Sequence, residues 1–411
     1  MNRGWPPTLS QRAEVALVLC ITLLALGLRA VGHWYAPRGW REDELSNALV
    51  VSQHVREGEL RLYYDDASGH EGLYHWLQAG TMAVFGPGVW GIRGVSILLG
   101  TAAVALTYLL ARRLFDWPTA AIAALLLAFS FWSLMYSRSG QRHISVTVTT
   151  LLSFYLMWRA VRRQDMAEQS RGVVYHAPMR NYLLAGVALG VGFYTYFAAR
   201  GVPLIVIAWG VYLFLWARPL WRKTWRGLLV MLAVAALLAA PLVVILLRQP
   251  EAEARVAELA QPIDDARQGD FSTLGRYALT TLSMFTHDGD DEVLYNVPHR
   301  PVFGPLGALL FWAGVGLALV RSFGPSRDER HAFLLLWLGA GLAPGALSVP
   351  AASLGHTILA QPVAMIFPAL ALGEGARWLV KAGRPQQARA ALLAGAMVLV
   401  GWEGARGIHD Y

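Results

Sequence analysis

Long apolar runs recur along almost the whole chain and constrain its fold more than any other feature. The first extends from Val15 to Val31, and the later ones are bounded by charges or by Pro and Gly. A helix needs about 20 apolar residues to cross the hydrocarbon core of a bilayer. With 55% hydrophobic residues and 16 Trp among 411, the chain has more apolar material than a soluble domain buries. We therefore expect an all-α membrane protein.

The apolar runs predict about eleven transmembrane helices in one domain that covers the whole chain, 1–411. Several runs are nearer 16 than 20 residues and would need snorkelling side chains or local thinning of the bilayer. The runs are 15–33, 89–110, 118–135, 144–160, 182–197, 202–217, 227–247, 302–320, 332–348, 357–376 and 389–402.

Basic residues cluster in alternate connections between the runs. The clusters lie at 112–113, 159–180, 218–226, 321–330 and 377–389. Because Lys and Arg in short loops favour the cytoplasmic side, we expect a cytoplasmic N-terminus in a plasma or inner membrane. The net charge of +8 is explained by these loops and indicates no nucleic-acid partner. The first run lacks a small-residue cleavage site before Trp34 and is expected to remain as an anchor.

This orientation places two long segments outside the membrane, 34–89 and 248–301. The first is expected to carry two amphipathic helices along the membrane surface, joined by a turn at 63–66. The second opens with a polar helical run, 251–267, and continues with an apolar face between Leu274 and Phe285. The chain ends directly after the last apolar run, which leaves open a C-terminal extracytoplasmic domain beyond it.

Asp43 and Glu44 follow the first run at the start of the first outer helix. A carboxylate there can act as a general base on a substrate delivered by the membrane. The alternative is a structural role, since acids at a helix N-terminus offset its macrodipole. Farther along, Glu71 and His75 would stand four residues apart on a helix, as substrate-binding groups or as a plain helix start. No H-E-x-x-H spacing is present, so a metal is disfavoured.

Three arginines lie in short outer connections, where orientation rules disfavour positive charge. Arg138 and Arg142, four residues apart, could grip one anionic group, and Arg200 is a similar case. Snorkelling to lipid head groups is the alternative. The acidic cluster at 288–292 could bind a hard cation but lacks the spacing of a calcium loop, so a solvated turn is favoured. Cys20 is the only cysteine, which excludes a disulfide.

Several of these segments, in this order, resemble the bacterial GT-C glycosyltransferases. They are the acidic pair, the Gly72–Trp76 segment, the Arg93–Gly100 part of the second run, Ser137-Arg138, and 194–203. The chain is similar in particular to the relatives of protein O-mannosyltransferases and of the lipid A aminoarabinose transferase. The resemblance spans about Val15 to Gly373.

The resemblance implies inverting transfer of a sugar from a polyprenyl-phosphate donor to an acceptor hydroxyl on the outer face of the membrane. It implies Asp43 as catalytic base with Glu44 beside it. Asp290 lies in a stretch that resembles a bacterial branch of these enzymes. His356 lies where relatives place a His followed by an Arg, which this chain lacks, so His356 is only a candidate for the donor phosphate. No cofactor is required by this chemistry, although a divalent cation stays open.

Two other functions remain open at this point. A non-enzymatic carrier or flippase of lipid-linked sugars would also use many spans and outer arginines, although a transporter is expected to place ionisable groups near the bilayer midplane. A polymerase or ligase of surface glycans would differ mainly in its acceptor. The sugar and the acceptor, whether a glycan, a lipid or a protein, are not readable from the sequence.

Overall fold

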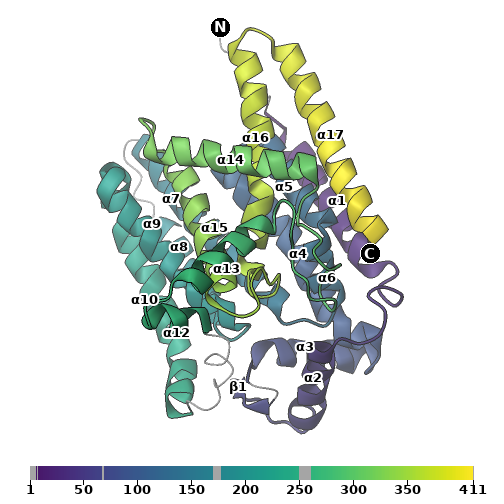
Figure 1. Ribbon diagram of the computed structural model, residues 1–411. Coiled ribbons are helices and arrows are strands. Elements are labelled where there is room, and N and C mark those ends of the chain that lie inside the picture. Colours follow the sequence, from purple (N-terminus) through teal and green to yellow (C-terminus); the bar gives the residue numbers. More distant parts are fainter. Residues whose placement is uncertain (1–5, 7, 67–68, 170–176, 250–260, 411) are drawn as a thin grey trace.

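Helices account for all the apolar runs in the computed structural model, which describes residues 6, 8–66, 69–169, 177–249 and 261–410. The long helices form a bundle in which α1 and the pair α16 and α17 lie toward one side (Figure 1). They are α1 (Gln11–Ala30), α4 (Val89–Leu114), α5 (Trp117–Phe129), α7 (His143–Gln169), α8 (Ala177–Gly192), α9 (Val202–Trp216), α10 (Arg218–Arg248), α14 (Pro305–Phe323), α15 (Glu329–Leu347), α16 (Gln361–Lys381) and α17 (Pro385–Asp410).

The expected number of eleven spans is not confirmed. Within the described part of the chain, eight helices are long and apolar enough to cross a membrane, or up to nine if one bent pair counts as a single span. The runs that fall outside this number are α8, with 16 residues, and α15, which opens with the charged residues Glu329 and Arg330. The all-α membrane architecture is confirmed, and the exact number of crossings stays a prediction.

The run at 118–135, expected as one straight span, is broken into α5 and α6 (Phe131–Arg138), which bend by 57°. Ser130 ends one helix and caps the next, since its hydroxyl accepts from the Ser133 amide. Arg29 of α1 is fully buried and donates to the Ala128 carbonyl and to the Ser133 hydroxyl, at 3.4 and 2.8 Å. These bonds satisfy polar groups that the break would otherwise leave unpaired among apolar helices.

Small residues let the helices approach closely. This is common in membranes, where the hydrophobic effect does not drive helices together and close packing stabilises them instead. A Cβ on Gly314 of α14 would lie 2.1 Å from the Phe367 carbonyl of α16, and one on Gly227 of α10 would lie 2.2 Å from the Tyr182 ring of α8. Larger side chains would push these helix pairs apart. Between the helices, the core is rich in aromatic rings, which include Phe154, Trp158, Trp209, Phe333 and Trp337.

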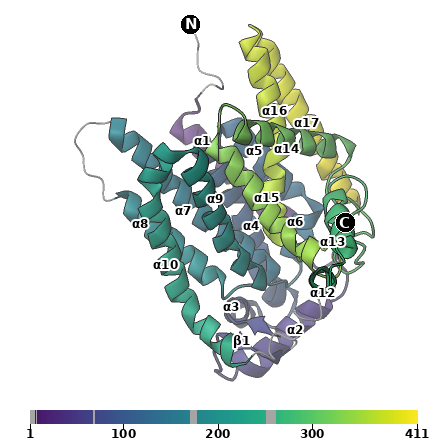
Figure 2. The same ribbon diagram turned by 60° about the vertical axis from the view of Figure 1, so that its left-hand side comes forward.

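The two ends of the bundle differ. At the end that we call the loop end, the connections 34–88, 139–142, 193–201, 284–304 and 348–357 gather; α2, α3 and β1 lie there at the bottom of both views (Figures 1 and 2). The opposite end is closed by ion pairs: Arg377 joins Asp116 at 2.6 Å and Glu374 at 2.7 Å. Arg330 also donates to the Leu114 carbonyl there.

The first outer segment is folded more elaborately than two helices and a turn. It contains α2 (Glu42–Val50), which continues as a π-helical turn, η1 (Val51–Val55), and α3 (Leu73–Phe85). The expected turn at 63–66 is instead strand β1 (Tyr63–Tyr64), paired antiparallel with β2 (His70–Glu71). A Cβ on Gly72 would lie 2.1 Å from the Arg61 carbonyl oxygen, so only glycine lets the chain pass from β2 into α3. Glu71 is therefore in a strand, and the expectation of a shared helix with His75 was wrong.

The second outer segment contains α12 (Gln261–Arg267) and α13 (Ser272–Ser283), followed by an irregular stretch. The expected polar helix at 251–267 lies partly outside the described residues, and its described part is helical. Two short 3-10 helices complete the loop end, η3 (Phe197–Gly201) and η5 (Ile358–Ala360).

Candidate functional site

Asp43 lies in the first turn of α2, half-buried, and faces the second outer segment. Its Oδ2 accepts a hydrogen bond from the hydroxyl of Tyr295, at 2.7 Å. Burial, together with the charge of Asp43, raises the pKa of Tyr295 well above its ordinary value, so the phenol stays a donor. The contact joins residues 252 positions apart and engages one of the two carboxylate oxygens of Asp43.

Glu44, the neighbour of Asp43, has a different environment and does not share the site with it. Its side chain is fully buried and pairs with Arg93 of α4, at 2.7 Å between Oε1 and Nε. The same carboxylate accepts from the backbone amides of Gly140, at 2.6 Å, and of Arg41, at 2.9 Å. Since these donors occupy both oxygens, Glu44 is placed to hold neighbouring segments together.

Two arginines converge on one buried carboxylate. Arg142 approaches Glu71 Oε2 at 2.9 Å and Arg200 approaches Glu71 Oε1 at 3.4 Å, while Glu71 itself is 2% exposed. Arg142 also lies over the ring of Tyr196 and Arg200 over that of Phe197. Two guanidinium groups around one carboxylate leave a net positive charge, and both keep partly exposed faces. Such an arrangement suits an anionic ligand.

Arg138 does not belong to this pair, contrary to the expectation that it and Arg142 hold one group. Arg138 is the last residue of α6 and donates to the carbonyls of Leu28 and Val31, at 3.0 and 3.1 Å. These carbonyls lie at the C-terminal end of α1, where helix carbonyls lack intrahelical partners. The chain leaves the helix between Arg138 and Arg142, so the two side chains face different neighbours.

A row of aromatic rings links the two halves of the site. Tyr295 stacks on Tyr136 at 5.8 Å between centroids, Tyr136 meets His143 at 5.2 Å, and His143 meets Tyr196 at 4.2 Å. The row therefore runs from the partner of Asp43 to the ring beneath Arg142. Tyr196 is only 9% exposed and is part of this wall.

Asp290 fastens the irregular stretch after α13 to the loop before η5. Its Oδ2 accepts from the Leu354 amide at 2.7 Å, and its Oδ1 accepts from the Glu292 amide at 3.0 Å. Burial raises the pKa of Asp290 above its ordinary value. With 1% exposure, Asp290 is a structural link, and the expectation that it binds substrate has no support in these contacts. His356 lies in the same loop, half-buried, with its ring bonded to the Ser348 hydroxyl.

His75 lies beneath the surface of the first segment. It is fully buried and stacks on His70, with the rings at 5.2 Å and 4°. Burial lowers its pKa to about 3, and the positive charge of Arg142 acts in the same direction. A neutral, enclosed imidazole packs the wall behind Arg142 and offers no surface to a ligand.

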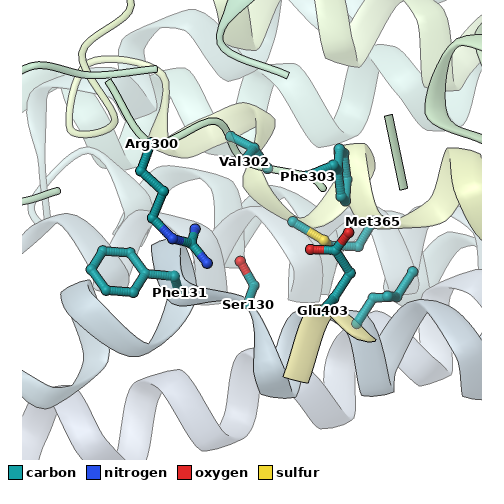
Figure 3. Close-up of a pocket in the computed structure, with 8 residues that line it drawn as sticks. Ser130, Phe131, Arg300, Val302, Phe303, Met365 and Glu403 are labelled. Carbon is teal, nitrogen blue, oxygen red and sulfur yellow. The ribbon is translucent and has the colours of Figure 1, made fainter. Parts of the chain in front are cut away.

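The irregular stretch is also tied to α17. Arg300 pairs with Asp410 at 2.5 Å and lies over the ring of Phe131, and Figure 3 shows it reaching toward Phe131 and Ser130. Glu403, drawn on the other side of the same view, accepts from the Gly304 amide at 2.8 Å. The space between these side chains is about 10 Å³, enough for about one water molecule. These contacts attach the irregular stretch to α17. Tyr295, which contacts Asp43, belongs to the same stretch.

An apolar groove opens beside the arginine pair. It has a volume of about 220 Å³ and is lined, among the described residues, by Phe193, Leu242, Val243, Leu246, Leu247 and the charged Arg200. Phe193 follows α8, and the aliphatic residues belong to the last turns of α10. The groove therefore joins an apolar wall to a cation that also contacts Glu71.

No cluster of three or more His, Cys, Asp and Glu side chains converges anywhere in the described ranges. A divalent cation would find no ready set of ligands among these residues.

Comparison with known proteins adds evidence from sequence. Residues 71–245 match the family model described as dolichyl-phosphate-mannose-protein mannosyltransferase. An undecaprenyl phosphate-alpha-4-amino-4-deoxy-L-arabinose arabinosyl transferase of Pseudomonas aeruginosa (strain LESB58) is 34% identical over 218 residues, which is 51% of this chain and 35% of the relative. A second such transferase, from Pseudomonas fluorescens (strain Pf0-1), is 30% identical over 57% of this chain and 40% of its own length.

Solved structures share the fold over nearly the whole chain. The oligosaccharyltransferase of Archaeoglobus fulgidus superposes with a TM-score of 0.60 at 16% identity, over 94% of this chain and 53% of that one. ArnT from Cupriavidus metallidurans, solved bound to undecaprenyl phosphate, gives 0.54 at 15% identity over 95% and 77%. The chain therefore shares the fold of these two proteins.

The family match covers only part of the candidate site. It includes Glu71, Arg142, Arg200 and most of the apolar groove, whereas Asp43, Tyr295 and the groove residues Leu246 and Leu247 lie outside residues 71–245. The chain also spans only about two fifths or less of the length of the curated relatives that it matches. Of the residues that form the site, sequence reasoning missed Tyr295, Tyr136 and His143, since no spacing in a single sequence connects them to Asp43.

Proposed function

We propose that this chain is a GT-C glycosyltransferase that transfers a sugar, with inversion, from a polyprenyl-phosphate donor to an acceptor hydroxyl of a glycan, lipid or protein. Asp43 acts as general base, and Arg142 and Arg200 bind the donor phosphate. The apolar groove lined by Phe193 and the end of α10 receives the first part of the polyprenyl chain. The two curated relatives carry names with an undecaprenyl-phosphate sugar, which agrees with this donor class.

The observation that carries the proposal is that the positively charged side chain of Arg200 lies at the edge of the apolar groove. Its guanidinium contacts Glu71, which also holds Arg142, and the same side chain lines the apolar groove. A polyprenyl phosphate has this polarity, an anionic head on an apolar tail. Two arginines can bind phosphate oxygens with charge-assisted hydrogen bonds, while Glu71 keeps both guanidinium groups oriented when the donor is absent.

The proposed reaction needs two kinds of help from the protein. As the acceptor oxygen bonds to the anomeric carbon, its proton passes to the Asp43 carboxylate, which Tyr295 holds by one oxygen. At the same time the bond from that carbon to the phosphate oxygen breaks, and its electron pair leaves with polyprenyl phosphate. The guanidinium groups of Arg142 and Arg200 stabilise the negative charge that develops on the leaving group.

A direct assay tests this function. The purified protein is incubated with a panel of polyprenyl-phosphate sugars in the presence of candidate acceptors, and release of polyprenyl phosphate is followed. We expect release with at least one donor, dependent on Asp43. Movement of intact donor across proteoliposomes without cleavage would instead establish a carrier and overturn the proposal.

We further propose that the loop end faces away from the cytoplasm and that the N-terminus is cytoplasmic, because the basic clusters lie in connections at the opposite end. Single cysteines in a Cys20→Ser background test this at two exposed positions, Glu57 near η1 and Gln386 in the first turn of α17. An impermeant thiol reagent on intact cells is expected to label Glu57→Cys and not Gln386→Cys. Labelling of Gln386→Cys alone would show that the protein has the opposite orientation.

A further inference from the structure

The carboxylate of Glu44 joins three parts of the chain that are far apart in sequence. Arg93 donates to it through Nε and Nη2, at 2.7 and 3.0 Å, the Gly140 amide donates at 2.6 Å, and the Arg41 amide at 2.9 Å. Glu44 is fully buried and Arg93 is 2% exposed, so solvent does not screen their attraction. A buried pair with this many hydrogen bonds holds its geometry tightly.

Arg93 extends the junction to the chain that follows α1. Its Nη1 donates to the carbonyl of His33 at 2.8 Å, and its Nη2 donates to that of Gly39 at 2.7 Å. The ring of Trp40 covers the guanidinium at 5.2 Å. Arg93 of α4 therefore holds both the segment that precedes α2 and the first turn of α2, which carries Asp43.

The bond from Gly140 brings in the other half of the site. Gly140 lies in the connection between α6 and α7, two residues before Arg142, and its carbonyl accepts from Asn47 of α2 at 2.6 Å. The connection is therefore held to α2 by two hydrogen bonds in opposite directions. Asp43 lies one residue from Glu44, and Arg142 lies two residues from Gly140.

We infer that Glu44 and Arg93 form a positioning pair that sets the distance between Asp43 and Arg142. This inference rests on the proposed function, in which these two residues serve the acceptor and the donor phosphate. Transfer requires the base and the cation to face the two sides of one anomeric carbon, and a misplacement of about 1 Å can cost about 100-fold in rate. Glu44 and Arg93 themselves touch neither substrate.

The test is a double-mutant cycle on turnover. Glu44→Gln replaces one acceptor oxygen by a donor NH₂, which faces other donors, and we expect kcat to fall about 10-fold to 100-fold with a smaller change in donor affinity. In the Asp43→Asn background, Glu44→Gln is expected to lower kcat by less than twofold, because residues that act as a unit are non-additive. A merely structural loss would lower the activity of both backgrounds by the same factor.

Asp116→Asn is the control, since Asp116 likewise pairs with one arginine and accepts from a backbone amide, one where Glu44 accepts from two, but at the opposite end. Its kcat is expected to stay within twofold of the parent. Arg93→Lys, which keeps the positive charge, is measured as well in case Glu44→Gln fails to fold, and we expect the same non-additivity with Asp43→Asn. Additive losses would overturn the inference, whereas full activity of Asp43→Asn alone would overturn the proposed base instead.

Discussion

Asp43→Asn is expected to lower turnover about 100-fold or more, since general-base catalysis contributes about 10² to 10⁴ in rate. The amide keeps the size of the carboxylate and can still accept from the Tyr295 hydroxyl, but it cannot take a proton. Thermal stability is therefore expected to change little. The measurement is release of polyprenyl phosphate by purified variants, alongside their melting temperatures.

Glu42→Gln is the control for this prediction, because Glu42 is an exposed acid in the same helical turn. It changes the local charge equally and is expected to retain the parent turnover. Loss of activity in Asp43→Asn that is matched by loss of folding, or equal losses in both variants, would remove Asp43 from the role of base.

Donor binding is expected to weaken about 10-fold to 100-fold in Arg142→Gln and in Arg200→Gln. Charge-assisted hydrogen bonds are worth about 1.5 to 3 kcal/mol, and each tenfold in affinity corresponds to about 1.4 kcal/mol. Lysine at either position is expected to restore only part of the affinity, because a point charge lacks the planar fork of a guanidinium. The measurement is affinity for the polyprenyl-phosphate sugar in detergent, with a neutral polyprenol as reference ligand.

Arg138→Gln serves as the matched variant, the same substitution four positions before Arg142. Since Arg138 bonds to the last carbonyls of α1, we expect a lower melting temperature and an unchanged donor affinity. If Arg138→Gln weakened donor binding as much as Arg142→Gln does, or if polyprenol binding fell equally in all variants, the assignment of the phosphate site would be wrong.

The bundle was largely predictable because apolar runs must become helices in a bilayer, where each backbone polar group needs an internal partner. The same reasoning did not predict the break at Ser130, beside which the Ala128 carbonyl accepts from Arg29, a residue about a hundred positions earlier in the sequence. Nor did it predict the pairing of Tyr63–Tyr64 with His70–Glu71, which replaced the expected turn.

The candidate site was predictable in residue types and not in partners. Charge in unfavourable places drew attention to Arg142 and Arg200, but sequence spacing alone grouped Arg142 with Arg138 instead of with Glu71. Adjacent residues likewise pointed to one function for Asp43 and Glu44, although successive side chains on a helix face different directions. Long-range contacts such as that of Tyr295 with Asp43 are set by tertiary packing, and no local pattern encodes them.

The contacts between α17 and the stretch after α13 affect the order in which the parts of the site form during synthesis. Arg300 and the Gly304 amide find their partners, Asp410 and Glu403, on α17, which is synthesised after α1 to α16. Synthesis proceeds from the N-terminus, so Asp43 emerges long before the residues that anchor the partner of its carboxylate. The nascent polypeptide therefore carries its base early but completes the surroundings of that base only when α17 has docked.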